Sequence, residues 1–205
     1  MIPAIVLAAG RSSRMGSAKA LLPIDDRETF LTRIVRTFRE AGVDRIVVVL
    51  GHDAAPLIER LRSAGLSAEV VVNTGYDAGQ LSSLLVGLDA IEARADAALV
   101  EGVLLMLVDE PLVAKDTVRA VIERYRATRA PIVRPVRGDQ HGHPVVIDRS
   151  LFPLLREADP ARGAKPVVRA HVSAEGDVPV DDAGAFLDID TPGEYQRVFG
   201  GKVKR

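Results

Sequence analysis

Cations, hydroxyls and small residues gather in one short segment near the start of the chain, at residues 8–19. The segment reads AAGRSSRMGSAK and contains Arg11, Ser12, Arg14 and Lys19. Small residues let a backbone approach a ligand closely, free turn amides point outward, and cations neutralise negative charge. These residue types predict an anion-binding loop, and a triphosphate is the expected guest. The alternative is a polar surface loop with solvated cations.

Two common phosphate-binding loops do not match this segment. A Walker loop places its lysine directly after the second glycine, but Gly16 is followed by Ser17. A dinucleotide loop needs Gly-x-Gly-x-x-Gly, which residues 8–11 do not supply. The segment is therefore neither an ordinary kinase loop nor an ordinary dehydrogenase loop.

A carboxylate follows the most apolar run of the chain. Residues 103–108 read VLLMLV and lead directly into Asp109, with Pro111 two positions later. Magnesium prefers one or two carboxylates together with substrate phosphates. Beside a triphosphate loop, Asp109 is expected to hold a divalent cation. Near the end of the chain, Asp188 and Asp190 supply two more carboxylates, of which one suffices to cap a helix.

Two further segments carry polar groups suited to ligand contact. Asn73 and residues 79–83 form a polar turn that leads into a helix, and Ser82 could either contact a nucleoside or simply cap that helix. His141 and His143 stand two positions apart, but no third nitrogen or sulfur ligand lies nearby in the sequence, which argues against zinc.

Strands and helices must alternate to position these groups. Apolar runs predict strands at residues 2–7, 45–50, 68–72, 103–108 and 131–136, the last an edge strand because prolines interrupt it. Helical spacing predicts helices at 28–41, 56–62, 84–91, 115–127 and from Pro192 onward. Such alternation indicates a mostly parallel sheet covered on both faces, with ligands beyond the carboxyl ends of its strands.

Composition limits the class of protein. The chain has 205 residues, 47% hydrophobic and 27% charged, and a net charge of −1, so it lacks the excess of cations that a nucleic-acid binder needs. The absence of cysteine excludes disulfides, thiolate zinc sites and cysteine nucleophiles. No apolar run approaches the roughly 20 residues of a membrane-spanning helix. We expect a cytoplasmic protein with a single domain at residues 1–199 and a tail at 200–205.

The motif LAAGRSSRMG at residues 7–16, with Lys19, resembles the signature loop of the MobA-like nucleotidyltransferases. The Ala-Ala-Gly form is similar to the molybdenum cofactor cytidylyltransferase branch, whereas the guanylyl branch usually carries Ala-Gly-Gly. Further segments resemble family elements in the same order: residues 79–83, 109–113, 142–145 and 188–192. The turn at 159–165 also resembles a family loop, although Lys165 replaces an arginine and so loses a bidentate contact.

The resemblance implies a Rossmann-like three-layer α/β/α fold with a mostly parallel mixed sheet, as in nucleotide-diphospho-sugar (GT-A-like) transferases. It implies Mg²⁺ as cofactor, with Arg14, Lys19 and Asp109 as catalytic groups and Asp109, Asp190 and Asp188 as metal ligands. The implied nucleotide-binding residues are Leu7, Ala8, Ala9, Gly10, Arg11, Ser12, Arg14, Lys19, Asn73, Gly79, Ser82 and Ser83. The implied acceptor-binding residues are His143, Pro144, Arg162 and Lys165.

The reaction that the resemblance implies is transfer of CMP from CTP to the phosphate of molybdopterin, with release of pyrophosphate. A molybdoenzyme or its chaperone would then receive the product, and neither nucleic acid nor membrane is expected as a partner. Three alternatives stay open: a guanylyl- or sugar-phosphate nucleotidyltransferase, a non-catalytic nucleotide- or cofactor-binding protein, and an oxidoreductase that binds a dinucleotide on the same type of fold.

Overall fold

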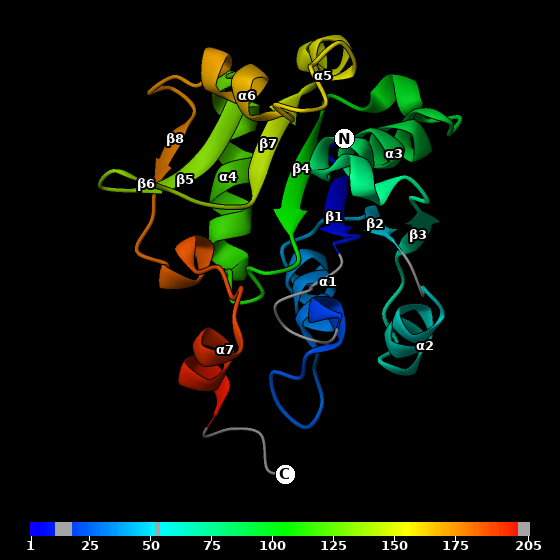
Figure 1. Ribbon diagram of the computed structural model, residues 1–205. Helices are drawn as coiled ribbons and strands as arrows, with labels where there is room; N and C mark the ends of the chain where they lie inside the picture. The colour runs from blue at the N-terminus through cyan, green and yellow to red at the C-terminus, as the bar shows by residue number, and fades with distance from the viewer. Residues whose placement is uncertain (11–17, 52–53, 201–205) are drawn as a thin grey trace.

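The computed structural model describes residues 1–10, 18–51 and 54–200 (Figure 1). Their strands form one eight-stranded sheet in the order β3-β2-β1-β4-β7-β5-β6, with β8 paired to β5. The strands are β1 (Ala4–Ala8), β2 (Ile46–Leu50), β3 (Glu69–Val72), β4 (Gly102–Leu107), β5 (Ile132–Arg137), β6 (Gln140–His141), β7 (Val145–Asp148) and β8 (Asp177–Pro179). The expected α/β fold with a mostly parallel mixed sheet is confirmed.

The first half of the sheet is parallel. Strand β1 lies between β2 and β4, and β3 continues the parallel set beyond β2. The second half is mixed: β7 pairs antiparallel with both β4 and β5, β6 pairs antiparallel with β5, and β8 pairs parallel with β5. The carboxyl ends of β1 to β4 therefore open at the same edge, where the polar loops of the sequence follow.

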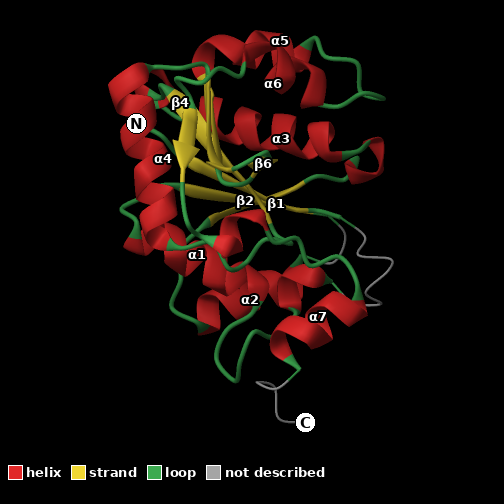
Figure 2. Ribbon diagram, turned by 90° about the vertical axis from the view of Figure 1, so that its left-hand side faces the viewer, coloured by secondary structure: helices red, strands yellow, loops and turns green. Residues whose placement is uncertain are grey.

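Helices cover both faces of the sheet. Figure 2 shows α3, α5 and α6 above the strands and α1, α2 and α7 below them. The helices are α1 (Phe30–Glu40), α2 (Ala55–Ser63), α3 (Gln80–Glu92), α4 (Lys115–Thr128), α5 (Phe152–Arg156), α6 (Lys165–His171) and α7 (Pro192–Phe199). Five short 3₁₀ turns lie between them within the described residues: η1 (Lys19–Leu21), η2 (Tyr76–Ala78), η3 (Ala97–Leu99), η4 (Arg149–Leu151) and η5 (Ala183–Phe186).

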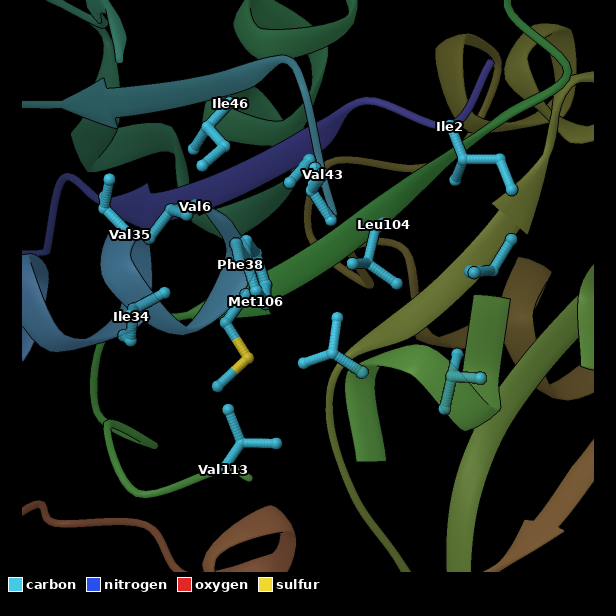
Figure 3. Packing of buried hydrophobic residues seen from close by; sticks show 14 of the residues in the cluster. Ile2, Val6, Ile34, Val35, Phe38, Val43, Ile46, Leu104, Met106 and Val113 are labelled. Atoms are coloured by element: carbon cyan, nitrogen blue, oxygen red, sulfur yellow. The ribbon is translucent and has the colours of Figure 1, made fainter. Parts of the chain in front are cut away.

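The core consists of two large apolar clusters separated by the sheet. Val6 and Leu104 pack with α1 and α4 in the first cluster, where Figure 3 shows Phe38 and Met106 beside them. Ile5, on the opposite side of β1, packs with α3 in the second cluster. Successive side chains of a strand point to opposite faces, so a strand covered on both sides needs a continuous apolar run.

Local signals fix several helix ends. Thr29 and Thr32 form a capping box at the start of α1, and Gly42 follows its end with a φ of +88°, a conformation that glycine adopts without steric cost. Thr191 and Glu194 form a second capping box at α7. Helix α7 packs its Phe199 into a third, smaller apolar cluster against α1.

One expectation about the sheet was wrong. Strand β5 is not an edge strand, because it pairs with β7 and β6 along one side and with β8 on the other. Pro135 is tolerated there because a strand residue directs its N–H toward one neighbour only, and its carbonyl still accepts a hydrogen bond from the Gly142 amide at 3.0 Å. The two- and three-residue partners β6 and β8 are too short to show in a hydrophobic pattern.

None of the helices in residues 1–10, 18–51 and 54–200 is both long and apolar enough to cross a bilayer.

Candidate functional site

A cavity of about 370 Å³ opens at the carboxyl ends of the parallel strands. It is bounded by the ends of β1 and β4, the segment that begins η1, the turn η2, the start of α3 and the segment before α7. The lining residues are Leu7, Ala8, Ala9, Gly10, Ala18, Lys19, Ala20, Tyr76, Gly79, Gln80, Ser83, Leu107, Val108, Asp109 and Asp190. Four segments that are distant in the sequence thus meet where the sheet topology predicts a ligand.

Lys19 lines this cavity and interacts with residues from two distant parts of the chain. Its Nζ donates a hydrogen bond to Asp109 Oδ2 at 3.2 Å and another to Asp190 Oδ1. Burial lowers the pKa of Lys19, but the hydrogen bond to Asp190 and the charge of Asp109 outweigh it, so the pKa lies above its ordinary value. The ammonium therefore stays charged between two carboxylates.

The residues present fit a divalent cation. Asp109 and Asp190 already converge on one cation, the Lys19 ammonium, and the second oxygen of Asp109, Oδ1, is buried without a hydrogen-bond partner. Within the part of the chain that the structure describes, no three His, Asp or Glu side chains are clustered closely enough to hold a metal by themselves. Two carboxylates can hold a divalent cation whose remaining ligands are phosphates and water.

The segment before α7 is held against the end of β4. The Ile189 amide donates to the Asp109 carbonyl at 2.9 Å, and the Asp190 amide donates to Glu194 Oε2 at 2.9 Å. Asp188, which precedes them, has its pKa raised to about 6, first by burial of part of the carboxyl and then by the nearby charge of Glu110. Asp188 therefore lies near the carboxyl groups of Asp109, Glu110 and Asp190 at this edge of the sheet.

Asn73 stabilises the loop between β3 and α3 and does not line the cavity. Its side chain is buried, donates to the hydroxyls of Ser82 and Ser83 at 2.9 and 3.0 Å, and accepts from the Gly75 amide at 2.9 Å. The suggestion that Ser82 caps α3 was wrong, because Gly79 is the N-cap and Ser82 lies inside the first turn. Of these residues, Gly79 and Ser83 reach the cavity.

On the expected acceptor side, the structure joins His143 to a carboxylate. His143 Nδ1 lies 2.6 Å from Glu110 Oε1, and Glu110 is only 3% exposed. The His143 amide donates to the Ala185 carbonyl at 3.0 Å, and Pro144 is buried. Glu110 directly follows Asp109 in the sequence, but neither Glu110 nor His143 is among the residues that line the cavity.

Arg162 and Lys165 are not brought into the cavity. Both side chains are exposed, on the turn before α6 and at the first residue of that helix, and neither is among the lining residues. Arg11, Ser12 and Arg14 lie outside the described residues, although Gly10 and Ala18 on either side of them line the cavity.

Six lining residues were not among the expected site residues: Ala18, Ala20, Tyr76, Gln80, Leu107 and Val108. The signal for Tyr76 is Gly51, at the end of β2, where an added Cβ would come within 2.5 Å of the Ala9 carbonyl and 3.1 Å of the Tyr76 ring. A glycine at a strand end can mark a close approach of backbone and ring. Gln80 carries no such signal beyond its place at the start of a helix.

Comparison with known proteins places these features in a family. The family model described as the MobA-like NTP transferase domain matches residues 4–175. The match includes Lys19 and Asp109 but ends before Asp188 and Asp190, so it gives no support to those two.

Curated relatives of nearly full length have different activities. Nicotine blue oxidoreductase of Paenarthrobacter nicotinovorans is 28% identical, over 97% of this chain and 96% of that one. Molybdenum cofactor cytidylyltransferase of Escherichia coli K12 is 26% identical, over 95% and 93%. The 2-C-methyl-D-erythritol 4-phosphate cytidylyltransferase of Saccharopolyspora erythraea is 32% identical, over 98% and 88%.

Solved structures share the whole fold. Rv0371c of Mycobacterium tuberculosis H37Rv superposes with a TM-score of 0.77 at 32% identity, over 98% of both chains. The same protein in complex with manganese gives a TM-score of 0.73 at 31% identity, over 97% of this chain and 98% of that one.

Proposed function

Because the chain belongs to the MobA-like NTP transferase family, we propose that it transfers CMP from CTP to the phosphate of a molybdopterin acceptor. An oxygen of the acceptor phosphate forms a bond to the α-phosphorus of CTP. The bond from that phosphorus to the bridging oxygen breaks, and pyrophosphate leaves with the electron pair. The products are a pyrophosphate-linked dinucleotide and free pyrophosphate. Since the reaction consumes a nucleoside triphosphate, we place it in the cytoplasm.

One observation carries the proposal: Lys19, Asp109 and Asp190 meet in a cavity that residues at the end of β1 also line. An ammonium and two carboxylates are the groups that a triphosphate and its counter-ion require together. A purely structural ion pair would leave neither an adjacent cavity nor a buried carboxylate oxygen without a partner, as Asp109 Oδ1 is.

The chain's own residues supply position and charge. The backbone at Ala8–Gly10 borders the cavity closely, and Lys19 offers a cation to the phosphates. No general base is needed, because a phosphate acceptor is already ionised near neutral pH. Asp109 and Asp190 would hold Mg²⁺, with Asp188 as the further candidate, and the bound ion would neutralise charge that develops on the triphosphate.

The choice of CTP as the nucleotide is supported by fewer observations than nucleotidyl transfer itself. It is supported by the Ala-Ala-Gly sequence of residues 8–10 and by the similarity to two cytidylyltransferases. Transfer of a guanylyl group, or transfer to a sugar phosphate, would use the same geometry. Calorimetric titration with CTP and with GTP separates these possibilities, and tighter binding of GTP would contradict the cytidylyl assignment.

The similarity to nicotine blue oxidoreductase over 97% of the chain supports a second candidate, an oxidoreductase that binds a dinucleotide on the same type of fold. Such an enzyme has no evident use for a lysine held between two carboxylates. Oxidation of NADH or NADPH in the presence of a quinonoid dye, followed by absorbance, would distinguish it from nucleotidyl transfer.

The direct test is release of pyrophosphate from each of the four NTPs with Mg²⁺, in the presence and absence of molybdopterin. We expect release with CTP that requires both the metal and the acceptor. A complete lack of turnover with every NTP would refute the proposed enzyme activity.

A further inference from the structure

The cavity is lined by an aromatic side chain that the reaction described above does not use. Among the lining residues within the described part of the chain, Tyr76 of the turn η2 is the one aromatic. It is partly buried. The other two tyrosines lie elsewhere: Tyr125 donates a hydrogen bond to the Glu101 carbonyl and Tyr195 to the Pro23 carbonyl. Tyr76 therefore calls for an explanation within the cavity itself.

The backbone that carries Tyr76 is held from both sides. Before it, the buried Asn73 side chain accepts a hydrogen bond from the Gly75 amide at 2.9 Å and donates to two serine hydroxyls in the first turn of α3. After it, the Gly79 amide donates to the Tyr76 carbonyl at 3.1 Å. The turn η2 is thus attached to the start of α3, so the position of Tyr76 does not depend on a ligand.

The ring of Tyr76 packs against the end of β2. An added Cβ on Gly51 would stand 3.1 Å from both Cγ and Cδ1 of this ring and 2.5 Å from the Ala9 carbonyl oxygen. Glycine at this strand end allows the close approach of backbone and ring. One part of the ring therefore rests on backbone while another part lines the cavity. A ring that is already ordered can bind a ligand without a large loss of side-chain entropy.

The sheet separates this ring from the charged groups. Strand β1 lies between β2 and β4, and neighbouring strands are about 4.8 Å apart, so Gly51 after β2 and Asp109 after β4 are roughly 10 Å apart across the sheet. The small residues Ala8–Gly10 line the cavity at the end of β1, between these two. The lining thus passes from an aromatic ring, over small residues, to Lys19 and Asp109. A nucleoside triphosphate has the same order of parts: a flat base, a sugar and anionic phosphates.

The expected acceptor side lies in the opposite direction. His143 is in the loop before β7, and β7 pairs with β4 on the side away from β1. Tyr76 follows β3, on the other side of β1. A base beside Tyr76 and an acceptor near His143 would therefore not compete for the same space, and both could reach phosphates held at Lys19.

We propose that Tyr76 is the residue on which the base of the nucleoside triphosphate stacks. Stacking on an aromatic side chain tolerates any base, because every base has a π face. Tyr76 therefore strengthens the binding of all four NTPs to a similar degree and leaves the choice between CTP and GTP to other groups. The proposal rests on the proposed function, because it assigns the residue that binds the base of that substrate.

Calorimetric titration with Mg²⁺ and CTP, GTP or tripolyphosphate, which has no base, tests this assignment. Tyr76→Leu should weaken the binding of CTP and of GTP about tenfold each, the effect of one lost base–aromatic stack, and should leave tripolyphosphate unaffected. Tyr76→Phe keeps the ring and should restore the wild-type affinities. Leu99→Ala, which shortens an exposed side chain in the turn η3 outside the cavity, should change none of the three.

Two results of this titration would overturn the proposal. Equal weakening of tripolyphosphate in Tyr76→Leu would mean that the ring only maintains the shape of the cavity. A Tyr76→Phe variant as weak as Tyr76→Leu would mean that the hydroxyl, and not the ring, makes the contact.

NMR signals of the tyrosine rings report the contact directly. The chain has three tyrosines and no tryptophan, so the ring signals are few and can be assigned by substitution. CTP with Mg²⁺ should move the Tyr76 ring signals upfield, because the stacked base has a ring current. The signals of the completely buried Tyr125 should stay in place. Tripolyphosphate should move neither, and a Tyr76 shift as large as that with CTP would contradict stacking.

Pyrophosphate release separates this inference from the proposed function. Release with CTP, combined with an unchanged CTP affinity in Tyr76→Leu, would refute the role of Tyr76 and leave the transferase intact. No release with any NTP, combined with movement of the Tyr76 signals by CTP, would refute the transferase and leave a site for a nucleobase at Tyr76. Neither release nor movement would refute both.

Discussion

Lys19 and Asp109 set the electrostatics of the cavity at the level of single residues. The Lys19 ammonium donates one hydrogen bond to Asp109 and another to Asp190, which lies near the opposite end of the chain. A mutual neutralisation of this kind allows charged groups to be partly buried without a ligand. The residue types and their place after strands were predictable from the sequence, whereas the direct bonds between them depend on side-chain geometry that no spacing rule contains.

Asp109→Asn tests the carboxylate that follows β4. Asparagine has nearly the same shape but no charge, so we expect the fold to persist while Mg²⁺-dependent pyrophosphate release falls roughly 100-fold or more. Rates with CTP and circular dichroism spectra give the two measurements. Asp116→Asn, on the exposed surface of α4, removes the same charge and should change neither. Unchanged turnover in Asp109→Asn would remove this residue from the site.

Asp188 predicts a pH dependence of stability in the metal-free protein. The folded protein keeps this proton up to about pH 6, whereas the unfolded chain loses it near the ordinary pKa of 3.8. Between these values the folded state binds more protons, so the free energy of unfolding falls as pH rises, and the loss is complete above about pH 6. The cause is burial of part of the carboxyl, followed by the charge of Glu110.

Asp188→Asn should therefore match the wild type below about pH 4 and exceed it above about pH 6. The gain should stay within about 1 kcal/mol, because the outer part of Asp188 is exposed and water screens its charge. Urea unfolding with a chelator present, across this pH range, measures the difference. Asp181→Asn, an exposed neighbour in the same segment, should show no such trend. A stability difference that does not vary with pH would contradict the expectation.

At the level of elements, the sequence is most informative where the hydrophobic pattern is long. The strands β1, β2 and β4 and the helices α1 and α4 were predicted to within two residues of their observed ends, because each has a continuous or 3.6-residue apolar pattern. The short strands β6 and β8 and the turn η5 were not predicted, since two to four residues carry no measurable period. Of these short elements, β6 leads into the loop that carries His143, and η5 accepts a hydrogen bond from the His143 amide.

The turn η5 packs between the loop that follows β4 and the loop that follows β6. An added Cβ on Gly184, within η5, would meet the Leu112 carbonyl oxygen at 2.0 Å, and one on Gly142 would meet the Ala185 carbonyl oxygen at 1.9 Å. Asp182 secures the start of the turn by accepting hydrogen bonds from the Ala114 amide and the Thr117 hydroxyl. The loop that carries His143 is thus positioned by backbone contacts and not by a regular sheet ladder.

Gly142→Ala should disrupt this contact. The obstructing atom is backbone and cannot rotate away, so we expect a loss of about 2 to 3 kcal/mol in the free energy of unfolding, together with displacement of His143. Urea unfolding measures the first effect and the His143 ring signals the second. The matched control is Gly193→Ala in α7, where an added Cβ meets nothing within 4 Å and alanine should be neutral or slightly stabilising. Equal stability of the two variants would show that the loops can separate at little cost.

At the level of the whole molecule, the site is completed by a segment from the end of the chain. The parallel half of the sheet supplies Lys19 and Asp109, but Asp190 precedes α7, which lies below the sheet beside α1 (Figure 2). The sequence indicated a parallel sheet and a polar edge, but only the resemblance of residues 188–192 to a family element implied that the segment before α7 returns to this edge. That return depends on long-range packing in the third apolar cluster, where Phe199 lies 5.7 Å from Phe30 and 5.3 Å from Tyr195 between ring centroids.

Phe199→Ala should therefore separate activity from global folding. The ring is completely buried, so its loss should cost about 3 to 5 kcal/mol. Because this small third cluster is separate from the two large clusters on the faces of the sheet, we expect α7 to detach first, carrying Asp190 away from Lys19 while the sheet stays folded. Pyrophosphate release should then be lost at temperatures where circular dichroism still reports native secondary structure, and limited proteolysis should cleave the chain near α7.

The comparison variant is Phe152→Ala, which removes an equally large buried ring from α5 on the other face of the sheet. Its cost in stability should be similar, but α5 contributes no residue to the cavity, so the folded fraction should keep its activity. If the two variants lost activity in parallel with stability, the docking of α7 would have no specific part in completing the site. A loss confined to Phe199→Ala would instead show that the C-terminal helix controls whether the carboxylate pair is assembled.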